Sequence, residues 1–300
     1  MPTLDLKTGA ESERMAEAIR RVTRALERAG VESPSRDARL LVAEATGLDA
    51  ARLIAEPDRS LAQVERRRLA DFVEQRCARE PVSRIMGCRE FYGRDFAISP
   101  AVLDPRPDSE TLIETALALA EEEGWRARPI RILDVGTGSG CLLITLLAEL
   151  SAAGGVGTDL SVEALEVAAY NAARHGVASR ARFEVRRSLE GIEEHFDMVV
   201  CNPPYISSQE IAMLAPEVRD HDPRAALDGG ADGLNVYREV IPALSRVVPS
   251  GWVLFEVDAA QADAVAELLT TISGLQGSTG IRSASDLGGH VRCVAAKIQV

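Results

Sequence analysis

The stretch Ile132 to Cys141 reads ILDVGTGSGC, an apolar run followed by three glycines at alternate positions. The apolar run predicts a buried strand, and the glycines permit backbone conformations that bring the chain close to a ligand. A helix that starts at this turn would direct its first free N–H groups toward polar atoms. The stretch therefore predicts a strand, a ligand-binding turn and a helix.

Strand and helix patterns alternate from Ile130 to the end of the chain. The predicted strands cover residues 130–135, 154–159, 181–186, 196–201, 251–257, 279–285 and 290–298. The helices between them begin near Gly140, Ser161, Ser207, Asp232 and Ala259. Such alternation predicts an α/β fold with a doubly wound, mostly parallel seven-stranded sheet.

The N-terminal part has helical patterns only. A helix over residues 11–30 ends in Gly30, a second has Ser33 as its N-cap, and a third starts at Ser60 with Gln63 completing a capping box. We therefore expect a helical-bundle domain over residues 1–84. On sequence alone it is either a folding unit or a domain that recognises a macromolecular partner.

The next segment connects this bundle to the α/β part. Residues 87–99 alternate bulky and polar side chains around Gly93, which predicts a β-hairpin in a connector spanning residues 85–107. A helix from Asp108 to about Glu123 then opens the α/β domain, residues 108–300.

Composition and charge restrict the function. The chain has 46% apolar and 27% charged residues and no apolar run long enough to span a membrane, and its charged N-terminus (MPTLDLKTGAESERM) lacks a signal-peptide pattern. We therefore expect a cytoplasmic protein. Residues 1–80 hold 15 basic and 15 acidic residues, so the remainder carries all of the net charge of −12. This distribution disfavours a nucleic-acid substrate.

The five cysteines and four histidines are scattered along the chain, with no Cys-x-x-Cys pair. Their spacing predicts neither a disulfide framework nor a metal site.

The glycine spacing disfavours a dinucleotide. A dinucleotide fingerprint would have its third glycine at position 141, which is Cys141, whereas the glycine falls at position 140. The turn instead resembles that of class I S-adenosylmethionine (AdoMet) methyltransferases. Asp159 ends the second strand and, in that interpretation, bonds the ribose hydroxyls. The alternative is that Asp159 caps the following helix.

A second stretch, CNPPYIS (Cys201 to Ser207), follows the apolar run FDMVV. Prolines fix their own φ, so the turn holds its carbonyl groups in one orientation. The Asn202 side-chain oxygen and the Pro203 carbonyl are two acceptors for one planar NH2 group, and Tyr205 offers a face or a hydroxyl. The pattern favours methylation of an amide or amino-purine nitrogen by positioning, without a general base. The alternative is a plain strand-terminating turn.

The motifs together resemble the PrmC/HemK family of protein-(glutamine-N5) methyltransferases. The matching stretches are SPSRDARLL, EFYGRDFAIS, VLDPRPDSE, ILDVGTGSGC, FDMVVCNPPYIS, EVRDHDPRAALDGGADGL and DLGGHVRC. They run in order through nearly the whole chain. The resemblance implies a class I AdoMet-dependent methyltransferase fold. It also implies methyl transfer to the glutamine of the Gly-Gly-Gln motif in class-1 peptide chain release factors, with the release factor as the protein partner.

The resemblance also implies roles for individual residues. Those implied to bind AdoMet are Gly136, Thr137, Gly138, Ser139, Gly140, Asp159, Ser188, Leu189 and Asn202. Those implied to bind the substrate glutamine are Asn202, Pro203, Pro204, Tyr205, Phe91 and Arg106, of which Asn202, Pro203 and Tyr205 are the catalytic candidates. No metal is implied.

The chain departs from the family pattern at Asp104, Ser109, Ser188-Leu189 and Asp258, none of which lies in the NPPY turn. Three rival functions remain: a methyltransferase for an exocyclic amine of DNA or RNA, a non-catalytic AdoMet-binding or translation-associated scaffold, and a nicotinamide oxidoreductase. The low aromatic content (4%) disfavours the first, the intact Asn202 turn disfavours the second, and the glycine spacing disfavours the third.

Overall fold

The computed structural model describes residues 13–272 and 280–299, and these form two compact units that divide between Gly87 and Cys88. Residues 1–12, on which the signal-peptide expectation rests, and residue 279 of one predicted strand lie outside the described residues. Within the described residues, no helix is both long and apolar enough to cross a membrane.

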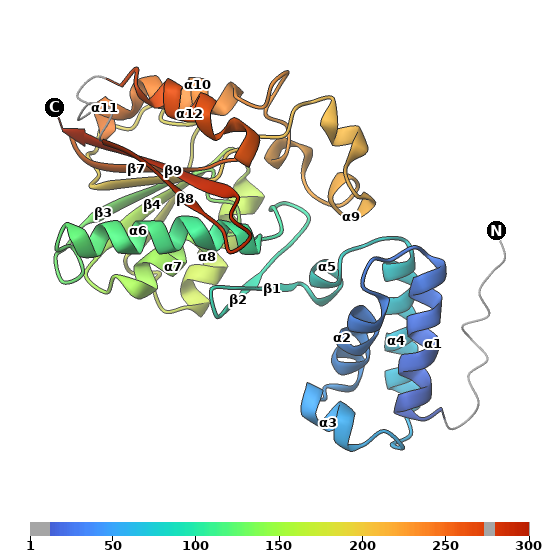
Figure 1. Cartoon of the computed structure of the whole chain (residues 1–300). Coiled ribbons are helices and arrows are strands. Elements are labelled where there is room, and N and C mark those ends of the chain that lie inside the picture. The colour runs from blue at the N-terminus through green and yellow to red at the C-terminus, as the bar shows by residue number, and fades with distance from the viewer. Residues whose placement is uncertain (1–12, 273–279, 300) are drawn as a thin grey trace. The chain divides into compact units, whose positions relative to one another are not determined.

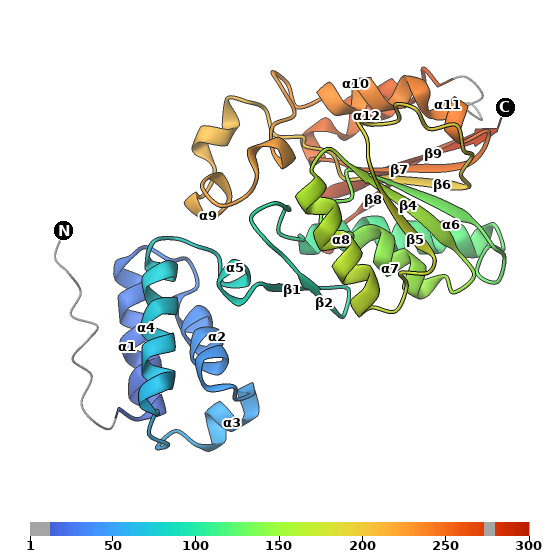
Figure 2. The same ribbon diagram turned by 180° about the vertical axis from the view of Figure 1, so that it is seen from behind.

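The first unit is helical, as predicted. Its helices are α1 (Met15–Arg28), α2 (Pro34–Thr46), α3 (Ala50–Ala55), α4 (Gln63–Cys77) and α5 (Val82–Met86). Helices α1, α2 and α4 lie side by side and bury one apolar core, which includes Met15, Leu41 and Leu69 (Figures 1 and 2). The left-handed Gly47 ends α2, because a residue without Cβ adopts that conformation at little cost.

The predicted start of the third helix is wrong. Helix α4 begins at Gln63, and Glu65 rather than Gln63 accepts the hydrogen bond from the backbone N–H of Ala62 (2.8 Å). Ser60 pairs with Arg14 in an isolated β-bridge instead. The short helices α3 and α5 were not predicted, since five or six residues are too few for a clear apolar period.

The second unit opens with a two-stranded antiparallel hairpin, β1 (Cys88–Phe91) and β2 (Arg94–Ala97), which confirms the predicted hairpin. The strands of the large sheet are β3 (Arg131–Val135), β4 (Gly154–Asp159), β5 (Ala181–Val185), β6 (Met198–Cys201), β7 (Ser250–Glu256), β8 (Ile281–Ser285) and β9 (Val291–Gln299). Their order is β5-β4-β3-β6-β7-β9-β8, and β9 alone runs antiparallel to the rest. The predicted mostly parallel seven-stranded sheet is confirmed.

Helices cover both faces of this sheet (Figure 1). The α-helices are α6 (Glu110–Glu122), α7 (Cys141–Glu149), α8 (Val162–Arg174), α9 (Pro216–Arg219), α10 (Asn235–Val240), α11 (Leu244–Val247) and α12 (Ala262–Leu269). The 3-10 turns are η1 (Pro107–Ser109), η2 (Glu210–Met213), η3 (Arg224–Ala226), η4 (Ile241–Ala243) and η5 (Ala259–Gln261). Helices α6, α7 and α8 share one core with the hairpin, and α10, α11 and α12 share the other.

The helix predicted near Ser207 is wrong. The chain after the Asn-Pro-Pro-Tyr turn forms only the short turns η2, α9 and η3, and it returns to that turn near Gly229. The backbone N–H of Ile206 donates to Leu227 O (3.1 Å), and that of Gly229 donates to Ile206 O (2.8 Å). These hydrogen bonds tie the segment to the turn. We call this segment, residues 206–233, the strap.

The strand order creates a switch point between β3 and β6. From β3 the chain moves outward through β4 to β5, then crosses back to β6 on the other side of β3. In open α/β sheets such a point leaves a crevice at the carboxyl ends of the two central strands. The glycine turn follows β3 and the Asn-Pro-Pro-Tyr turn follows β6, so the fold brings the two motifs to one edge.

Candidate functional site

The glycine turn is fixed to the neighbouring strand by its backbone. The N–H groups of Gly136 and Thr137 both donate to Thr158 O on β4, at 2.9 and 2.8 Å. Gly136 and Gly138 have φ of +74° and +54°, and a Cβ on either would meet no protein atom within 4 Å. These two glycines therefore leave an open space beside the backbone.

Gly140 has a different role from the other two glycines. A Cβ there would lie 2.7 Å from Ile144 Cδ1 and 3.2 Å from Ala168 Cβ. Gly140 therefore permits α7 to begin close to α8, and it does not line the cavity described below.

Asp159 joins the end of β4 to the glycine turn. One carboxylate oxygen accepts the backbone N–H of Gly138 and the other accepts that of Ser161, both at 3.0 Å. The N-cap of α8 is Ser161, whose hydroxyl accepts the N–H of Ala164 (3.0 Å), so helix capping does not explain Asp159. Asp159 lines the cavity.

A buried acid lies beneath the glycine turn. Asp134 on β3 is inaccessible to solvent, and its Oδ2 accepts hydrogen bonds from the Thr137 hydroxyl (2.7 Å) and the Leu143 N–H (3.3 Å). Burial raises the pKa of Asp134 to about 7, although both hydrogen bonds oppose the shift.

The Asn-Pro-Pro-Tyr turn is built from side chains. The Asn202 amide Nδ2 donates to the Ser109 hydroxyl (3.2 Å), which leaves Oδ1 as the acceptor on this side chain. The Tyr205 hydroxyl donates to Glu256 Oε1 (3.4 Å), and the Tyr205 carbonyl accepts from the Gln261 amide (2.9 Å). Burial is the main cause that raises the pKa of Tyr205, so the phenol stays protonated.

The strap packs closely against this turn. A Cβ on Gly229 would lie 2.6 Å from Pro204 O, and one on Gly233 would lie 2.1 Å from Tyr205 O. Glycines at these positions therefore let the strap reach the turn. Earlier in the strap, Asp222 forms an ion pair with Arg106, and the Asp222 side chain is only 1% exposed.

Both turns line one cavity of about 590 Å³, a volume typical of small-molecule sites. The predicted site residues that line it are Gly136, Thr137, Gly138, Ser139, Asp159, Ser188, Asn202, Pro203, Pro204 and Arg106. The fold therefore brings most of the predicted cofactor and substrate residues together.

Four predicted residues do not line this cavity: Gly140, Leu189, Tyr205 and Phe91. Leu189 is 2% exposed and Phe91 is 1% exposed, and each belongs to a hydrophobic core. Phe91 packs edge-on against Phe96, so the structure places it in the core beside the hairpin rather than on the cavity wall. The neighbouring Ser188 faces the cavity and donates to Glu239 (2.7 Å).

Two further residues support the site and were not predicted as members of it. Ser109 is 2% exposed and accepts from Asn202, and Glu256 is 1% exposed and accepts from Tyr205. The sequence signal for Glu256 was an acid at the end of the apolar run GWVLF. Buried acids require partners, so an acid at the end of an apolar strand indicates a candidate site residue.

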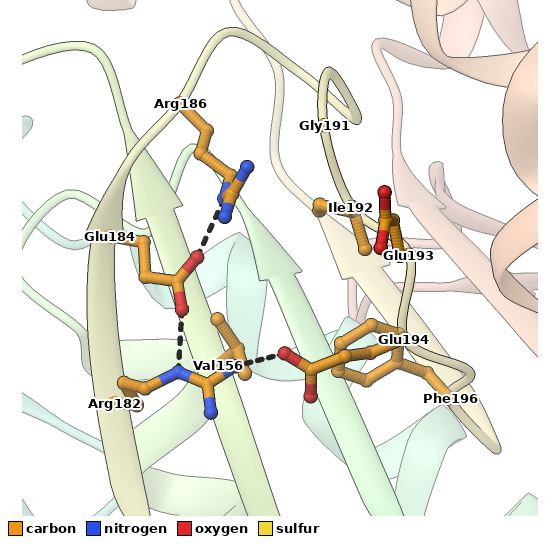
Figure 3. Close-up of a pocket in the computed structure, with 9 residues that line it drawn as sticks. All are labelled: Val156, Arg182, Glu184, Arg186, Gly191, Ile192, Glu193, Glu194 and Phe196. Carbon is orange, nitrogen blue, oxygen red and sulfur yellow. Dashed lines mark hydrogen bonds and ion pairs between the residues drawn. The ribbon is translucent and has the colours of Figure 1, made fainter.

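A second cavity, of about 220 Å³, lies on the edge strand β5. Figure 3 shows Arg182 between Glu184 and Glu194, and Arg186 paired with the other oxygen of Glu184. These charges satisfy one another, and charged side chains protect an exposed sheet edge from pairing. Within the part of the chain that the structure describes, no group of three or more His, Cys, Asp or Glu could hold a metal ion.

Family models match both units. The model described as "PrmC N-terminal domain" matches residues 17–87, and that described as "Methyltransferase small domain" matches residues 112–226. A protein of Bradyrhizobium diazoefficiens named release factor glutamine methyltransferase is 44% identical, over 94% of each chain. A protein of the same name from Cereibacter sphaeroides is 42% identical, over 95% of this chain and 99% of its own.

Solved structures share the fold at low identity. A methyltransferase from Pyrococcus furiosus has a TM-score of 0.50 at 15% identity, covering 70% of this chain and 91% of its own. The hMettl16 catalytic domain, solved with an RNA hairpin of a 3'UTR, has a TM-score of 0.54 at 16% identity, covering 72% and 80%. At these identities the likeness shows a class I methyltransferase fold and nothing of the substrate.

Proposed function

This chain belongs to the release factor glutamine methyltransferase family, and on that premise we propose that its cavity transfers a methyl group from AdoMet to a glutamine side-chain amide of a class-1 peptide chain release factor, in the Gly-Gly-Gln motif. The observation that carries the proposal is the shared cavity, in which an acceptor pair for a planar NH2 group lies beside a ligand-binding glycine turn.

The residues of the first turn fit AdoMet. The open side of Gly136 and Gly138 accommodates a ligand against the backbone, and the Asp159 carboxylate offers an acceptor for ribose hydroxyls. Leu160 and Val102 add apolar surface to the same cavity. We propose that Thr137, Ser139 and Ser188 complete this half of the site. When bound, AdoMet supplies an electrophilic methyl group on a sulfonium.

The residues of the second turn then act by position. Asn202 Oδ1 and the Pro203 carbonyl accept hydrogen bonds from the two N–H groups of the substrate amide. Both N–H groups lie in the amide plane, so these hydrogen bonds fix the orientation of that plane. The nitrogen lone pair, which is perpendicular to the plane, then faces the methyl group. Orientation of this kind supplies up to roughly 7–11 kcal/mol of the barrier in the best cases. The nitrogen becomes acidic once it is methylated, so its proton leaves without a dedicated base.

Arg106 is a further substrate candidate on the cavity wall. Its guanidinium pairs with Asp222, so we propose that it acts by holding the strap over the glutamine site. We also propose a cytoplasmic enzyme that makes no direct contact with nucleic acid, in keeping with the net charge of −12.

The test is methylation of a purified release factor with labelled AdoMet, followed by mass spectrometry of the modified residue. The proposal requires one added methyl group on the glutamine of the Gly-Gly-Gln motif. Label on DNA or RNA, with none on the release factor, would instead establish the rival amine methyltransferase.

We further propose that residues 1–84 recognise the body of the release factor, with the connector 85–107 and the methyltransferase domain 108–300 following. Each of the two compact units has its own hydrophobic core, so a variant lacking residues 1–84 retains a core around the large sheet. It should lose more activity on the whole release factor than on a short Gly-Gly-Gln peptide. An equal loss on both substrates would reduce the N-terminal unit to a folding role.

A further inference from the structure

One side-chain amide joins the glycine turn to the β1–β2 hairpin. Asn171 lies on α8, is inaccessible to solvent and does not line the cavity. Its Nδ2 donates to Ser139 O and to Ala97 O, and its Oδ1 accepts the Ala97 N–H, all at 2.9 Å. Both amide protons and the amide oxygen are therefore used, and they reach segments 32 and 74 positions away in the chain.

The contact with the hairpin resembles the pairing of a further strand. Ala97 is the last residue of β2 and pairs with Cys88 on β1. The Asn171 amide meets both the N–H and the C=O of Ala97, as a neighbouring backbone would. Residues 101–103, which follow a few positions later, line the cavity. Asn171 therefore fixes the point from which this part of the cavity wall extends.

The contact with the glycine turn depends on a close approach of α8. Ser139 lines the cavity and directly precedes Gly140, and α8 carries Ala168 about one turn before Asn171. A Cβ on Gly140 would lie only 3.2 Å from Ala168 Cβ. Because glycine has no Cβ, the helix can lie close to the turn, and Asn171 then reaches the Ser139 carbonyl.

Other contacts of α8 support one wall of the cavity only. His175 follows Asn171 by about one turn, its Nε2 lies 3.0 Å from Asp95 O, and its ring centroid lies 4.8 Å from that of Phe96. Val102 packs against α8 in a small apolar cluster. These contacts hold the connector to the helix, whereas Asn171 holds the connector and the glycine turn together.

We propose that Asn171 is a positioning residue for AdoMet binding: its amide sets the separation between the glycine turn and residues 101–103, which form two walls of the cavity. The inference rests on the proposed function, because it takes AdoMet as the ligand of the glycine turn. A ligand that needs both walls binds only those molecules in which both are in place, so its apparent affinity falls with their fraction. Asn171 keeps that fraction high without touching the ligand.

The test is Asn171→Asp, compared with the wild type by calorimetric titration with AdoMet and by steady-state methylation of a Gly-Gly-Gln peptide. Aspartate keeps the shape and the acceptor for Ala97, but it donates at most one hydrogen bond, so one of the two carbonyls loses its partner. We expect the dissociation constant for AdoMet to rise roughly 10-fold, as it would if about one molecule in ten kept both walls in place. At saturating AdoMet, kcat should stay within about 3-fold, because the Asn-Pro-Pro-Tyr turn is unchanged.

The matched control is His175→Ala, on the same helix. It removes the contacts with Asp95 and Phe96, so it weakens the docking of the hairpin while Asn171 still holds Ala97 and the glycine turn. Thermal stability should fall in both variants. The AdoMet affinity of His175→Ala should stay within about 2-fold of wild type, since both walls keep their places in nearly every molecule.

A measurement on the wild-type enzyme decides the matter if Asn171→Asp does not fold. Exchange of the Ala97 N–H reports the opening of its bond to Asn171, whereas exchange of the Gly93 N–H, which donates to Glu90 (2.6 Å), reports the tip of the hairpin. Because AdoMet binds molecules in which the Asn171 contacts are closed, it should slow the first exchange roughly 10-fold more than the second, measured by nuclear magnetic resonance. Equal slowing at both positions would overturn the inference.

The outcomes separate this inference from the proposed function. A wild-type enzyme that binds AdoMet but never methylates glutamine contradicts the proposed substrate, and the AdoMet titrations still decide the role of Asn171. Methylation by the wild type, together with unchanged AdoMet affinity in Asn171→Asp, overturns the positioning role alone. An equal loss of AdoMet affinity in His175→Ala also overturns it, because general loosening of the hairpin would then account for the effect.

Discussion

Strands β3 and β6 are neighbours, and the turns that follow them are built from different materials. The turn after β3 uses backbone N–H groups and left-handed glycines. Because glycine has no side chain, one side of this turn stays open for a ligand. The turn after β6 uses prolines, an amide and a phenol held by hydroxyl and carboxyl groups. The half of the cavity beside the glycine turn, the cofactor half, therefore depends on backbone shape. The half beside the Asn-Pro-Pro-Tyr turn, the substrate half, depends on side-chain polarity.

The largest effect that we predict is the loss of methyl-transfer rate in Asn202→Ala, which tests the role of the substrate half. Loss of the amide removes one of two acceptors for the substrate NH2 group, so we expect single-turnover methyl transfer to fall roughly 100- to 1,000-fold. AdoMet affinity, measured by calorimetry, should change far less. Asn235→Ala removes an exposed amide outside the cavity and is the matched control. Equal losses of rate and AdoMet affinity would assign Asn202 to the cofactor half instead.

Sequence reasoning predicted the backbone-built half better than the side-chain-built half. Alternating glycines and the acid at position 159 are local patterns, and they predicted the turn that the structure contains. The role of Gly140 depends on contact with Ala168, which no spacing within the turn reveals. The support of Asn202 by Ser109 joins residues 93 positions apart, and the burial of Phe91 depends on how the hairpin packs against the large sheet's core. Such contacts belong to tertiary structure.

Each half rests on one buried acid, which permits a second comparison. Asp134 lies beneath the glycine turn and Glu256 beside the Asn-Pro-Pro-Tyr turn, and burial raises the pKa of each to about 7. Unfolded, the Glu256 carboxyl releases its proton near 4.5. Between that value and about 7 the folded chain binds more protons, so its contribution to the free energy of unfolding decreases as pH rises.

The prediction concerns the neutral variants Asp134→Asn and Glu256→Gln. Relative to wild type, the free energy of unfolding of Glu256→Gln should increase by up to roughly 3 kcal/mol between pH 4.5 and 7. Asp134→Asn should show a similar trend, measured by urea unfolding across the same range. A difference in stability from wild type that stays constant between pH 4.5 and 7 would contradict the raised pKa of the carboxyl concerned.

The smallest effect, and the most direct test of a backbone-built half, is Gly138→Ala. Gly138 has φ of +54°, Gly47 at the end of α2 has φ of +67°, and a Cβ added at either would meet no protein atom within 4 Å. An alanine at either position carries a similar conformational cost of roughly 1–2 kcal/mol, so both variants should lose similar stability. Gly138→Ala alone should weaken AdoMet binding, by roughly 10-fold, because its methyl group occupies space that the open side of the turn leaves for a ligand. Calorimetric titration with AdoMet measures the difference, and equal affinities in the two variants would show that the glycine is required for the turn rather than for the approach of the ligand.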